Sequence, residues 1–432
     1  MQKHLEAALF ASVVGLVFAG SQGAHAQQAR AAPVGTDMVQ GLSRERLGRI
    51  AGVMKQEIEK GHFPGAVTLI ARRGEIVHFE AHGFLDAAKT KPMAKDSIFR
   101  MASMTKAITS IAAMMLVEQG VFKINDPIET FLPELKGLKV EVAKKNSDGT
   151  VVTEDVPANR PVTIQDLLRH TSGFYYAGAI PSKRLKDAYE EANIEAREVA
   201  ITADEMLKKL GQIPLAHQPG TNFHYSISTD VLGLLLERAT KKPLDVVLHE
   251  MVIGPLGMKD TAFWVPAEKA ARLGEVLDSD PQKKASLAYC RTEAEIKKSY
   301  LKGGAGLCGT AEDYFKFVQM IGNGGAFEGK RYLSKKTVEF MLQDHLVGMG
   351  GSTVASTGPG YGFGLGFAVR LQDGFGWSAG SKGDAMWGGA FGTSFTIDPR
   401  EQLVAVQLTQ GPTPRSHSRH LFKNLIYGAM VD

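Results

Sequence analysis

The chain has 432 residues, and its 50 lysine and arginine residues nearly balance its 46 aspartate and glutamate residues, giving a formal net charge of +4 at pH 7. That charge is small for the length, and no cluster of basic residues is dense enough to indicate binding to nucleic acid. After the first 26 residues, no apolar run is long enough for stable insertion into a membrane. The remaining length allows one large domain or two interleaved ones.

The N-terminus has the pattern of an export signal. Lys3 gives a short basic start, residues 7–20 are apolar but too few to span a bilayer, and Ala24-His25-Ala26 matches an A-x-A cleavage site. We therefore expect a signal peptide over residues 1–26 and a periplasmic or secreted protein. Residues 27–41, rich in alanine, glutamine and proline, are expected to form a flexible leader.

A helix and a β-hairpin are predicted at the start of the mature chain. From about Ser43, apolar residues recur at helical intervals. Two runs typical of strands follow, residues 66–71 and 76–81, and the short segment Arg72-Arg73-Gly74-Glu75 joins them as a turn.

The next region, residues 99–345, is predicted to be mainly helical, with loops at 144–161 and 266–297. The end of the chain is β-rich and closes with a helix; the segments are 362–371, 385–387, 393–397 and 403–408 for strands and 416–430 for the helix.

Strands at both ends of a helical middle predict an α+β fold. An antiparallel sheet would be built from the N- and C-terminal segments and flanked by helices. We expect residues 42–98 and 346–432 to form this α/β domain and residues 99–345 to form an inserted, mainly helical one. A cleft between the two would be the expected place for a functional site.

Ser103-Met104-Thr105-Lys106 places a hydroxyl and an amine one helical turn apart. The apolar spacing of residues 107–120 predicts a helix, and residues three apart share a helix face, so Ser103 Oγ and Lys106 Nζ can meet. A serine becomes a good nucleophile when a base takes its proton, and a lysine in an apolar pocket can lose its charge and act as that base. Because the tetrapeptide is common by chance, an exposed pair on a solvated helix is the alternative.

Two further segments could complete a site for acyl transfer. Such a site needs a second proton carrier and backbone N–H groups that stabilise an oxyanion. Tyr225, just ahead of an apolar helix at residues 231–239, could carry the proton. Trp387-Gly388-Gly389-Ala390 joins two short strands, and its small residues let backbone approach a substrate. Taken singly, Tyr225 could be a core aromatic residue and the glycines a β-bulge.

Taken together, these motifs resemble the serine β-lactamase and penicillin-binding superfamily, and most closely its β-lactamase-like esterases, the family VIII carboxylesterases. The resemblance covers the chain from about residue 42 to its end and rests on Phe99-Arg100-Met101-Ala102-Ser103-Met104-Thr105-Lys106, Asp166-Leu167-Leu168-Arg169-His170-Thr171-Ser172-Gly173, Pro255-Leu256-Gly257-Met258 and Gly303-Gly304-Ala305-Gly306-Leu307.

The resemblance implies a fold like that of class C β-lactamases and a role for each motif residue. Ser103 would be the acylated nucleophile, Lys106 its base, and Tyr225 the residue that relays the proton and helps activate water. The backbone N–H groups of Ser103 and Ala390 would form the oxyanion hole. No cofactor is implied.

Two departures from the β-lactamase pattern bear on the substrate. Where lactamases have Tyr-x-Asn, this chain has Tyr225-Ser226-Ile227, and Ile227 cannot donate to a substrate amide oxygen. Where they have Lys-Thr-Gly, it has Trp387-Gly388-Gly389, so an indole replaces the cation that would meet a substrate carboxylate. Losing such a charge-assisted contact weakens the binding free energy of an anionic substrate by about 1.5–3 kcal/mol. These substrate-binding candidates favour neutral, apolar esters over β-lactams and D-Ala-D-Ala peptides.

The sequence thus predicts a serine carboxylesterase that acts on small-molecule esters with short to medium acyl chains. A weak β-lactamase of the cephalosporin type is the alternative, followed by a D-amino-acid peptidase, an amidase or a transesterase on the same fold. A non-enzymatic binding protein that retains the fold is a further alternative. The sequence leaves the physiological ester and the oligomeric state open.

Several residues have weaker signals. Gly376-Trp377-Ser378-Ala379-Gly380 fits the nucleophile elbow G-x-S-x-G, but no helix is expected after it, so Ser378 is predicted to be a loop serine. His170 is expected to brace a loop and not to catalyse. No metal is expected, because four histidines lack a third ligand at metal spacing: His217, His224, His417 and His420.

The aromatic residues and cysteines leave alternatives open. Tyr175, Tyr176, Phe375 and Trp377 could line an acyl pocket or could be ordinary core and loop residues. Cys290 and Cys308 could pair in an exported protein. However, Cys308 lies in an apolar run, where a buried free thiol is the preferred prediction.

Overall fold

The computed structural model describes residues 37–432 apart from Pro181 and residues 196–199. The predicted signal peptide and residues 27–36 of the predicted leader lie outside the described residues. Within the described part of the chain, no helix is long and apolar enough to cross a membrane. The last residues assigned to the leader take part in structure, because β1 (Met38–Val39) pairs antiparallel with β2 (Leu42–Ser43).

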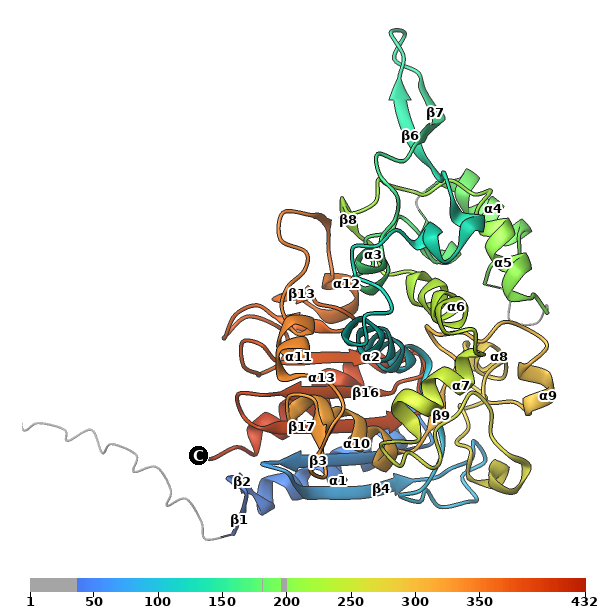
Figure 1. Ribbon diagram of the computed structural model, residues 1–432. Coiled ribbons are helices and arrows are strands. Elements are labelled where there is room, and N and C mark those ends of the chain that lie inside the picture. The colour runs from blue at the N-terminus through green and yellow to red at the C-terminus, as the bar shows by residue number, and fades with distance from the viewer. Residues whose placement is uncertain (1–36, 181, 196–199) are drawn as a thin grey trace, which may run out of the picture. The chain divides into compact units, whose positions relative to one another are not determined.

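A seven-stranded antiparallel sheet is built from both ends of the chain, in the order β13-β14-β15-β16-β17-β3-β4. β17 lies beside β3 over its full length, with Leu403 opposite Arg72 and Thr409 opposite Ala66, which joins the two ends of the chain (Figure 1). This architecture confirms the predicted α+β fold. The strands are β3 (Gly65–Arg72), β4 (Glu75–Gly83), β13 (Tyr361–Phe363), β14 (Ala368–Arg370), β15 (Ala385–Gly388), β16 (Ser394–Asp398) and β17 (Leu403–Thr409).

Helices cover both faces of the sheet. On one face, alternate residues of β3 such as Ala66 and Ile70 pack against α1 (Arg44–Glu59) and α13 (Arg415–Gly428). On the other face, the intervening residues join a larger core that includes α10 (Ala311–Gly322). Because both faces are covered, all of β3 is buried, and its sequence is almost continuously apolar.

The predicted first helix and hairpin are confirmed. The Ser43 side chain caps α1 by accepting from Arg46 N at 3.3 Å, and the apolar stripe of the helix faces the sheet. β3 and β4 pair antiparallel through the turn at Arg73 and Gly74, both with positive φ. The closing helix α13 is also where the sequence predicts it.

The middle of the chain is mainly helical, and its first α-helix is α2 (Thr105–Glu118). A single 3₁₀ turn, Ala102–Met104, precedes α2, and most side chains of α2 are buried. α6 (Ser228–Thr240) and α7 (Leu244–Leu248) pack against α2 (Figure 1). The assignment of residues 99–345 to a separate domain stays a prediction.

Shorter elements complete the structure. The helices are α3 (Ile164–Leu168), α4 (Lys183–Glu191), α5 (Ala203–Leu210), α8 (Lys283–Ser286), α9 (Glu293–Ile296), α11 (Lys335–Met341) and α12 (Val354–Thr357). The strands are β5 (Phe99–Arg100), β6 (Lys139–Lys145), β7 (Val151–Pro157), β8 (Asn222–Phe223), β9 (Cys308–Gly309), β10 (Ala326–Phe327), β11 (Lys330–Arg331) and β12 (Gly350–Gly351).

Three segments differ from the sequence prediction. Residues 144–161 are not one loop, because β6 and β7 pair there into a hairpin that projects from the helical region (Figure 1). The predicted loop at 266–297 contains the 3₁₀ helix Ala267–Arg272 and two short helices. The predicted strand at 362–371 is divided into β13 and β14 by a tight turn that includes Gly366, with φ of +95°.

Candidate active site

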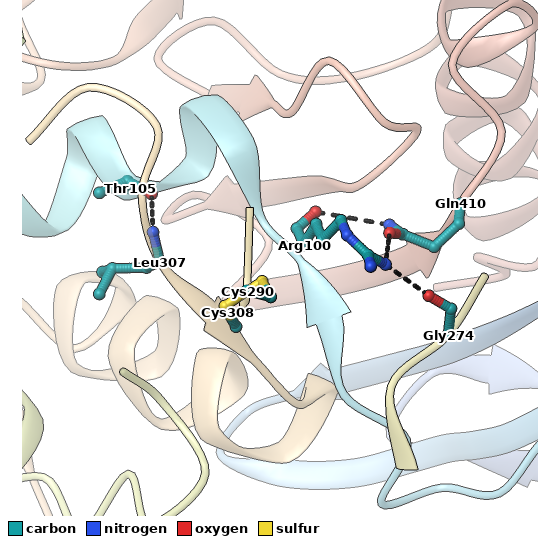
Figure 2. Close-up of a disulfide and its surroundings, with 7 residues drawn as sticks. All are labelled: Arg100, Thr105, Gly274, Cys290, Leu307, Cys308 and Gln410. Atoms are coloured by element: carbon teal, nitrogen blue, oxygen red, sulfur yellow. Dashed lines mark hydrogen bonds between the residues drawn. A yellow bond between two sulfur atoms is a disulfide. The ribbon is translucent and has the colours of Figure 1, made fainter. Parts of the chain in front are cut away.

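A disulfide braces the strand that leads to Ser103. Cys290 is bonded to Cys308, which lies in β9, and β9 pairs antiparallel with β5 just before Ser103 (Figure 2). In the same region the Arg100 guanidinium donates to Gly274 O at 2.6 Å. The expected free thiol at Cys308 is therefore wrong. The positive φ of Cys290 helps its loop bring the second thiol into place, a proximity that sequence spacing does not reveal.

The backbone around Ser103 is held in an uncommon conformation. Ala102 has a φ of +45°, which is unfavourable for a residue with a Cβ and persists only where neighbouring contacts enforce it. Tyr314 Oη donates to Met104 O at 2.9 Å. Figure 2 shows a second bond, in which Leu307 N donates to Thr105 Oγ1 at 3.0 Å. These bonds fix the backbone on the C-terminal side of Ser103.

Lys106 Nζ lies among three oxygen atoms. It is 2.7 Å from Gly304 O, 2.9 Å from Tyr176 Oη and 3.4 Å from Ser103 Oγ. A protonated amine can donate to all three, whereas a neutral amine has two N–H groups and one lone pair. The neutral form can therefore donate to Gly304 O and to one hydroxyl while it accepts the proton of the other. Since Lys106 is 1% exposed, these three oxygen atoms, and not water, form the hydrogen bonds of both the protonated and the neutral amine.

Tyr225 meets Lys106 through its ring. Lys106 Nζ is 4.7 Å from the ring centroid, and Tyr225 Oη accepts a hydrogen bond of 3.4 Å from Trp387 Nε1. The ring of His170 packs on that of Tyr225 with centroids 4.9 Å apart.

His170 has the bracing role that the sequence predicts. Ser226 N donates to His170 Nδ1 at 3.3 Å, and His224 N donates to His170 O at 2.8 Å, so His170 holds both ends of the segment that carries Tyr225. Burial and the neighbouring Lys106 lower the pKa of His170 well below its usual value, so its ring stays neutral.

Tyr176 belongs to this site, although its place in the sequence left its role open between an acyl pocket and the core. Its hydroxyl contacts Lys106 Nζ, and its ring lies 5.6 Å from that of Tyr225. Burial, and next the neighbouring Tyr225, raise the pKa of Tyr176 well above its usual value, so its phenol stays protonated. Tyr176 lies 70 positions from Lys106, and only its place shortly after the His170-Thr171-Ser172-Gly173 motif could have drawn attention to it.

A cavity of about 270 Å³ opens at Ser103. It brings together four predicted site residues from three segments of the chain, because Tyr225, Ile227 and Ala390 also line it. The rest of the wall is formed by Ala102, Tyr176, Gly178, Glu195, Asp230, Tyr289, Tyr300, Lys302, Ala305 and Phe391. Trp387 reaches this site through its bond to Tyr225.

The other aromatic candidates lie elsewhere. Phe375 and Trp377 are 47% and 58% exposed on the loop between β14 and β15, where Trp377 contacts His420, and neither lines the cavity at Ser103. Tyr175 stacks on His224 with ring centroids 3.5 Å apart. Ser378 lies in the same loop as Trp377, and no helix follows it before β15.

Gly388 and Gly389 let the backbone of Met101 and the side chain of Arg419 approach the end of β15 closely. A Cβ at Gly389 would overlap the carbonyl oxygen of Met101, and a Cβ at Gly388 would overlap the guanidinium of Arg419. Arg419, on α13, donates from Nη2 to Gly389 O at 2.5 Å. Burial lowers the pKa of Arg419 to about 10, so it remains a cation at neutral pH. Arg419 could not be predicted as part of this site, because it lies on a different element from the motif residues.

Comparison with known proteins identifies the family. The Beta-lactamase family model matches residues 50–427. The chain belongs to the β-lactamase family. Protein Rv1367c of Mycobacterium tuberculosis is 33% identical over 83% of this chain and 88% of its own length. Esterase EstB of Burkholderia gladioli is 30% identical over 84% of this chain and 89% of its own length.

Solved structures of this β-lactamase family agree with the fold described above. A structure titled "EstCE1, a hydrolase with promiscuous acyltransferase activity" matches with a TM-score of 0.74 and 27% identity, covering 90% of this chain and 99% of that one. The similarity to EstCE1 and EstB confirms the predicted resemblance to the β-lactamase-like esterases.

Proposed function

We propose that this β-lactamase family member is a serine hydrolase that cleaves carboxylic esters through an acyl-enzyme on Ser103. The observation that carries the proposal is that Ser103 and two tyrosines line one cavity while Lys106 Nζ contacts all three of them from the buried side. A nucleophile, a buried amine that can take its proton, and two phenols that can move protons are the groups that acyl transfer requires.

The charges around the cavity support a neutral ester as the substrate. Its wall includes the acidic residues Glu195 and Asp230 and one basic residue, Lys302, so it has no excess of positive charge to attract a carboxylate. Trp387 stands where a lactamase lysine would be, and Arg419 donates to Gly389 O without lining the cavity. These features favour short to medium acyl esters over β-lactams, which carry a carboxylate.

The proposed reaction has two steps. Lys106 takes the proton of Ser103 Oγ, which attacks the ester carbonyl carbon, and the oxyanion is stabilised by the N–H groups of Ser103 and Ala390. The C–O bond then breaks, and the alcohol leaves with a proton supplied by Lys106 or Tyr225. In the second step water loses a proton to the same groups and attacks the acyl carbon. The bond between that carbon and Ser103 Oγ then breaks, Oγ takes the proton back, and the carboxylic acid leaves.

Substitution of the proposed nucleophile and base tests this function. Ser103→Ala and Lys106→Ala should each reduce kcat/KM on p-nitrophenyl butyrate by about 1,000-fold or more, as removal of a nucleophile or its base does in other serine hydrolases. Ser103→Ala should also abolish labelling by a fluorophosphonate probe. Ser378→Ala is the matched control and should keep both properties. Labelling that survives in Ser103→Ala, or a wild-type rate in Lys106→Ala, contradicts the proposal.

Acyl transfer to an alcohol is a second candidate, favoured by the similarity to EstCE1. An alcohol in place of water in the second step would give a new ester, and an added alcohol should then appear in the product. Hydrolysis of nitrocefin as fast as that of short esters would instead favour the β-lactamase alternative, and cleavage of D-amino-acid amides the peptidase alternative.

Periplasmic or secreted location is part of this proposal and is supported by the disulfide, since disulfides persist in oxidising compartments.

A further inference from the structure

Three side chains with metal-binding atoms meet on the sheet face that α1 and α13 cover. Glu57 lies in the last turn of α1, His62 in the segment leading to β3, and His417 in the first turn of α13. His62 Nδ1 is 2.6 Å and His417 Nε2 is 3.0 Å from the same atom, Glu57 Oε2. All three potential ligand atoms lie within 4.8 Å of one another.

The donor set suits zinc. Zn²⁺ binds imidazole nitrogen and carboxylate oxygen at about 2.0–2.2 Å, in a tetrahedron whose ligand atoms are about 3.3 Å apart. The two histidine nitrogens would need to move away from Glu57 Oε2 by less than about 1 Å to reach that spacing. The side chains of His62 and His417 are 35% and 55% exposed, so they have room to move and water can reach the fourth position.

The carboxylate is already oriented for this role. The Glu57 side chain is 3% exposed, and Lys60 Nζ donates to its other oxygen, Oε1, at 2.8 Å. Such an outer partner fixes a metal ligand and leaves Oε2 directed at the two histidines. Without a metal, each histidine must present an N–H to that one oxygen, whereas a zinc ion would replace both protons and bind neutral imidazoles.

A second group of possible ligands, His78, Glu80 and His82 on β4, fits a metal less well. Thr68 Oγ1 lies 2.7 Å from His78 Nε2 and 3.0 Å from His82 Nε2, so a hydroxyl already bonds both ring nitrogens. The side chains of His78 and His82 are only 4% and 8% exposed. A metal would have to displace Thr68 and enter a buried position.

We propose that Glu57, His62 and His417 form a zinc site that joins α1 to α13. Glu57 and His417 are 360 positions apart, so the ion would link the two ends of the chain. None of the three residues lines the cavity at Ser103, so the ion would lie apart from that cavity. The sequence predicts no metal at His417, because only the fold brings His417 close to Glu57 and His62.

Zinc titration of the full chain after treatment with EDTA tests the site. Calorimetry with ZnCl₂ should show one equivalent bound, and His62→Ala and His417→Ala should each weaken binding at least tenfold. His249→Ala, which removes an exposed histidine from another helix, is the matched control and should bind like the wild type. Zinc should raise the melting temperature of the wild type and of the control but not of the two ligand variants. Far-UV circular dichroism verifies that each variant is folded.

Two results would overturn the proposal. One is the absence of binding or of a melting-temperature shift at 100-fold excess of zinc over protein, at about neutral pH. The other is binding that persists in both His62→Ala and His417→Ala but is lost in a His78→Ala/His82→Ala double variant, because the metal would then lie on β4. Co²⁺ in place of zinc gives an independent reading, since a tetrahedral site produces visible absorption that should disappear in His417→Ala.

Discussion

Lys106 has two tyrosine neighbours, and they meet it in different ways. Tyr176 presents its hydroxyl at 2.9 Å from Lys106 Nζ, whereas Tyr225 presents its ring. The hydroxyl oxygen of Tyr225 accepts from the Trp387 indole, which leaves its own proton available to a substrate. We infer different tasks for the two: Tyr176 adjusts the hydrogen bonding of the lysine, and Tyr225 protonates the leaving alcohol.

Esters with different leaving groups separate these tasks. An alkyl alcohol must be protonated as it leaves, while p-nitrophenolate leaves readily without a proton. Tyr225→Phe should therefore reduce kcat/KM on ethyl butyrate by about 100-fold or more and reduce it less on p-nitrophenyl butyrate. Tyr176→Phe should lower the rates on both esters by the same factor, because it acts before the alcohol leaves. Equal losses on the two esters in Tyr225→Phe would contradict the assignment.

At the scale of elements, α13 holds the end of β15 against the segment that carries Ser103. Arg419 of α13 donates to Gly389 O, and Gly389 N donates to Thr393 O at 2.8 Å. The Thr393 hydroxyl in turn donates to Met101 O at 3.1 Å. These contacts position the backbone N–H of Ala390, one of the two proposed oxyanion donors, without any side chain entering the cavity.

Removal of the Arg419 guanidinium should loosen this arrangement. We expect Arg419→Ala to lower kcat on p-nitrophenyl butyrate by about 10- to 100-fold, less than the loss of a whole oxyanion donor, with little change in KM. Added guanidinium ion should restore part of kcat, and Arg419→Lys should lie between Ala and wild type. Arg415→Ala, one turn earlier on the same helix, is the control. A wild-type kcat in Arg419→Ala, or a loss that only follows unfolding, would refute this role.

The elements that could be predicted are those with a clear apolar pattern. α1 has one apolar stripe because one side of it packs on a core, and β3 is apolar throughout because both of its faces are covered. β6 and β7 have no such signal, since most of their residues are exposed and the pairing satisfies only the backbone. Ser103 and Lys106 were predictable because they share a helix turn. Tyr176 and Arg419 were not, because their contacts depend on tertiary structure.

At the scale of the whole molecule, stability in acid depends on paired carboxylates such as Asp260. Arg272 donates to both oxygens of Asp260, at 3.0 and 2.9 Å, and with Lys269 it lowers the pKa of this carboxyl to about 2. An unfolded aspartate has a pKa of about 3.9, so Asp260 favours the folded state at pH values above that. This contribution is lost as the pH falls from about 4 through about 2.

Urea unfolding at several pH values measures this contribution. Asp260→Asn should lower the free energy of unfolding by about 1 kcal/mol at pH 7, and the difference from wild type should shrink as the pH falls from 4 towards 2. Asp278→Asn removes a carboxylate that is 82% exposed and should show a smaller effect at every pH. If the free energies of unfolding of Asp260→Asn and wild type differ by the same amount down to pH 2, the charge of the Asp260 carboxylate is not the cause of the stabilisation.

The disulfide connects the redox state of the surroundings with the shape of the cavity at Ser103. Cys290 follows Tyr289, a residue of the cavity wall, and both pack in one apolar cluster with Cys308 and Ala102, next to Ser103. Protein prepared from a reducing cytosol would lack this link, and non-covalent contacts alone would hold the Tyr289 loop beside Ser103. Rates measured on preparations from different expression hosts are therefore comparable only when their thiol content has been determined and matched.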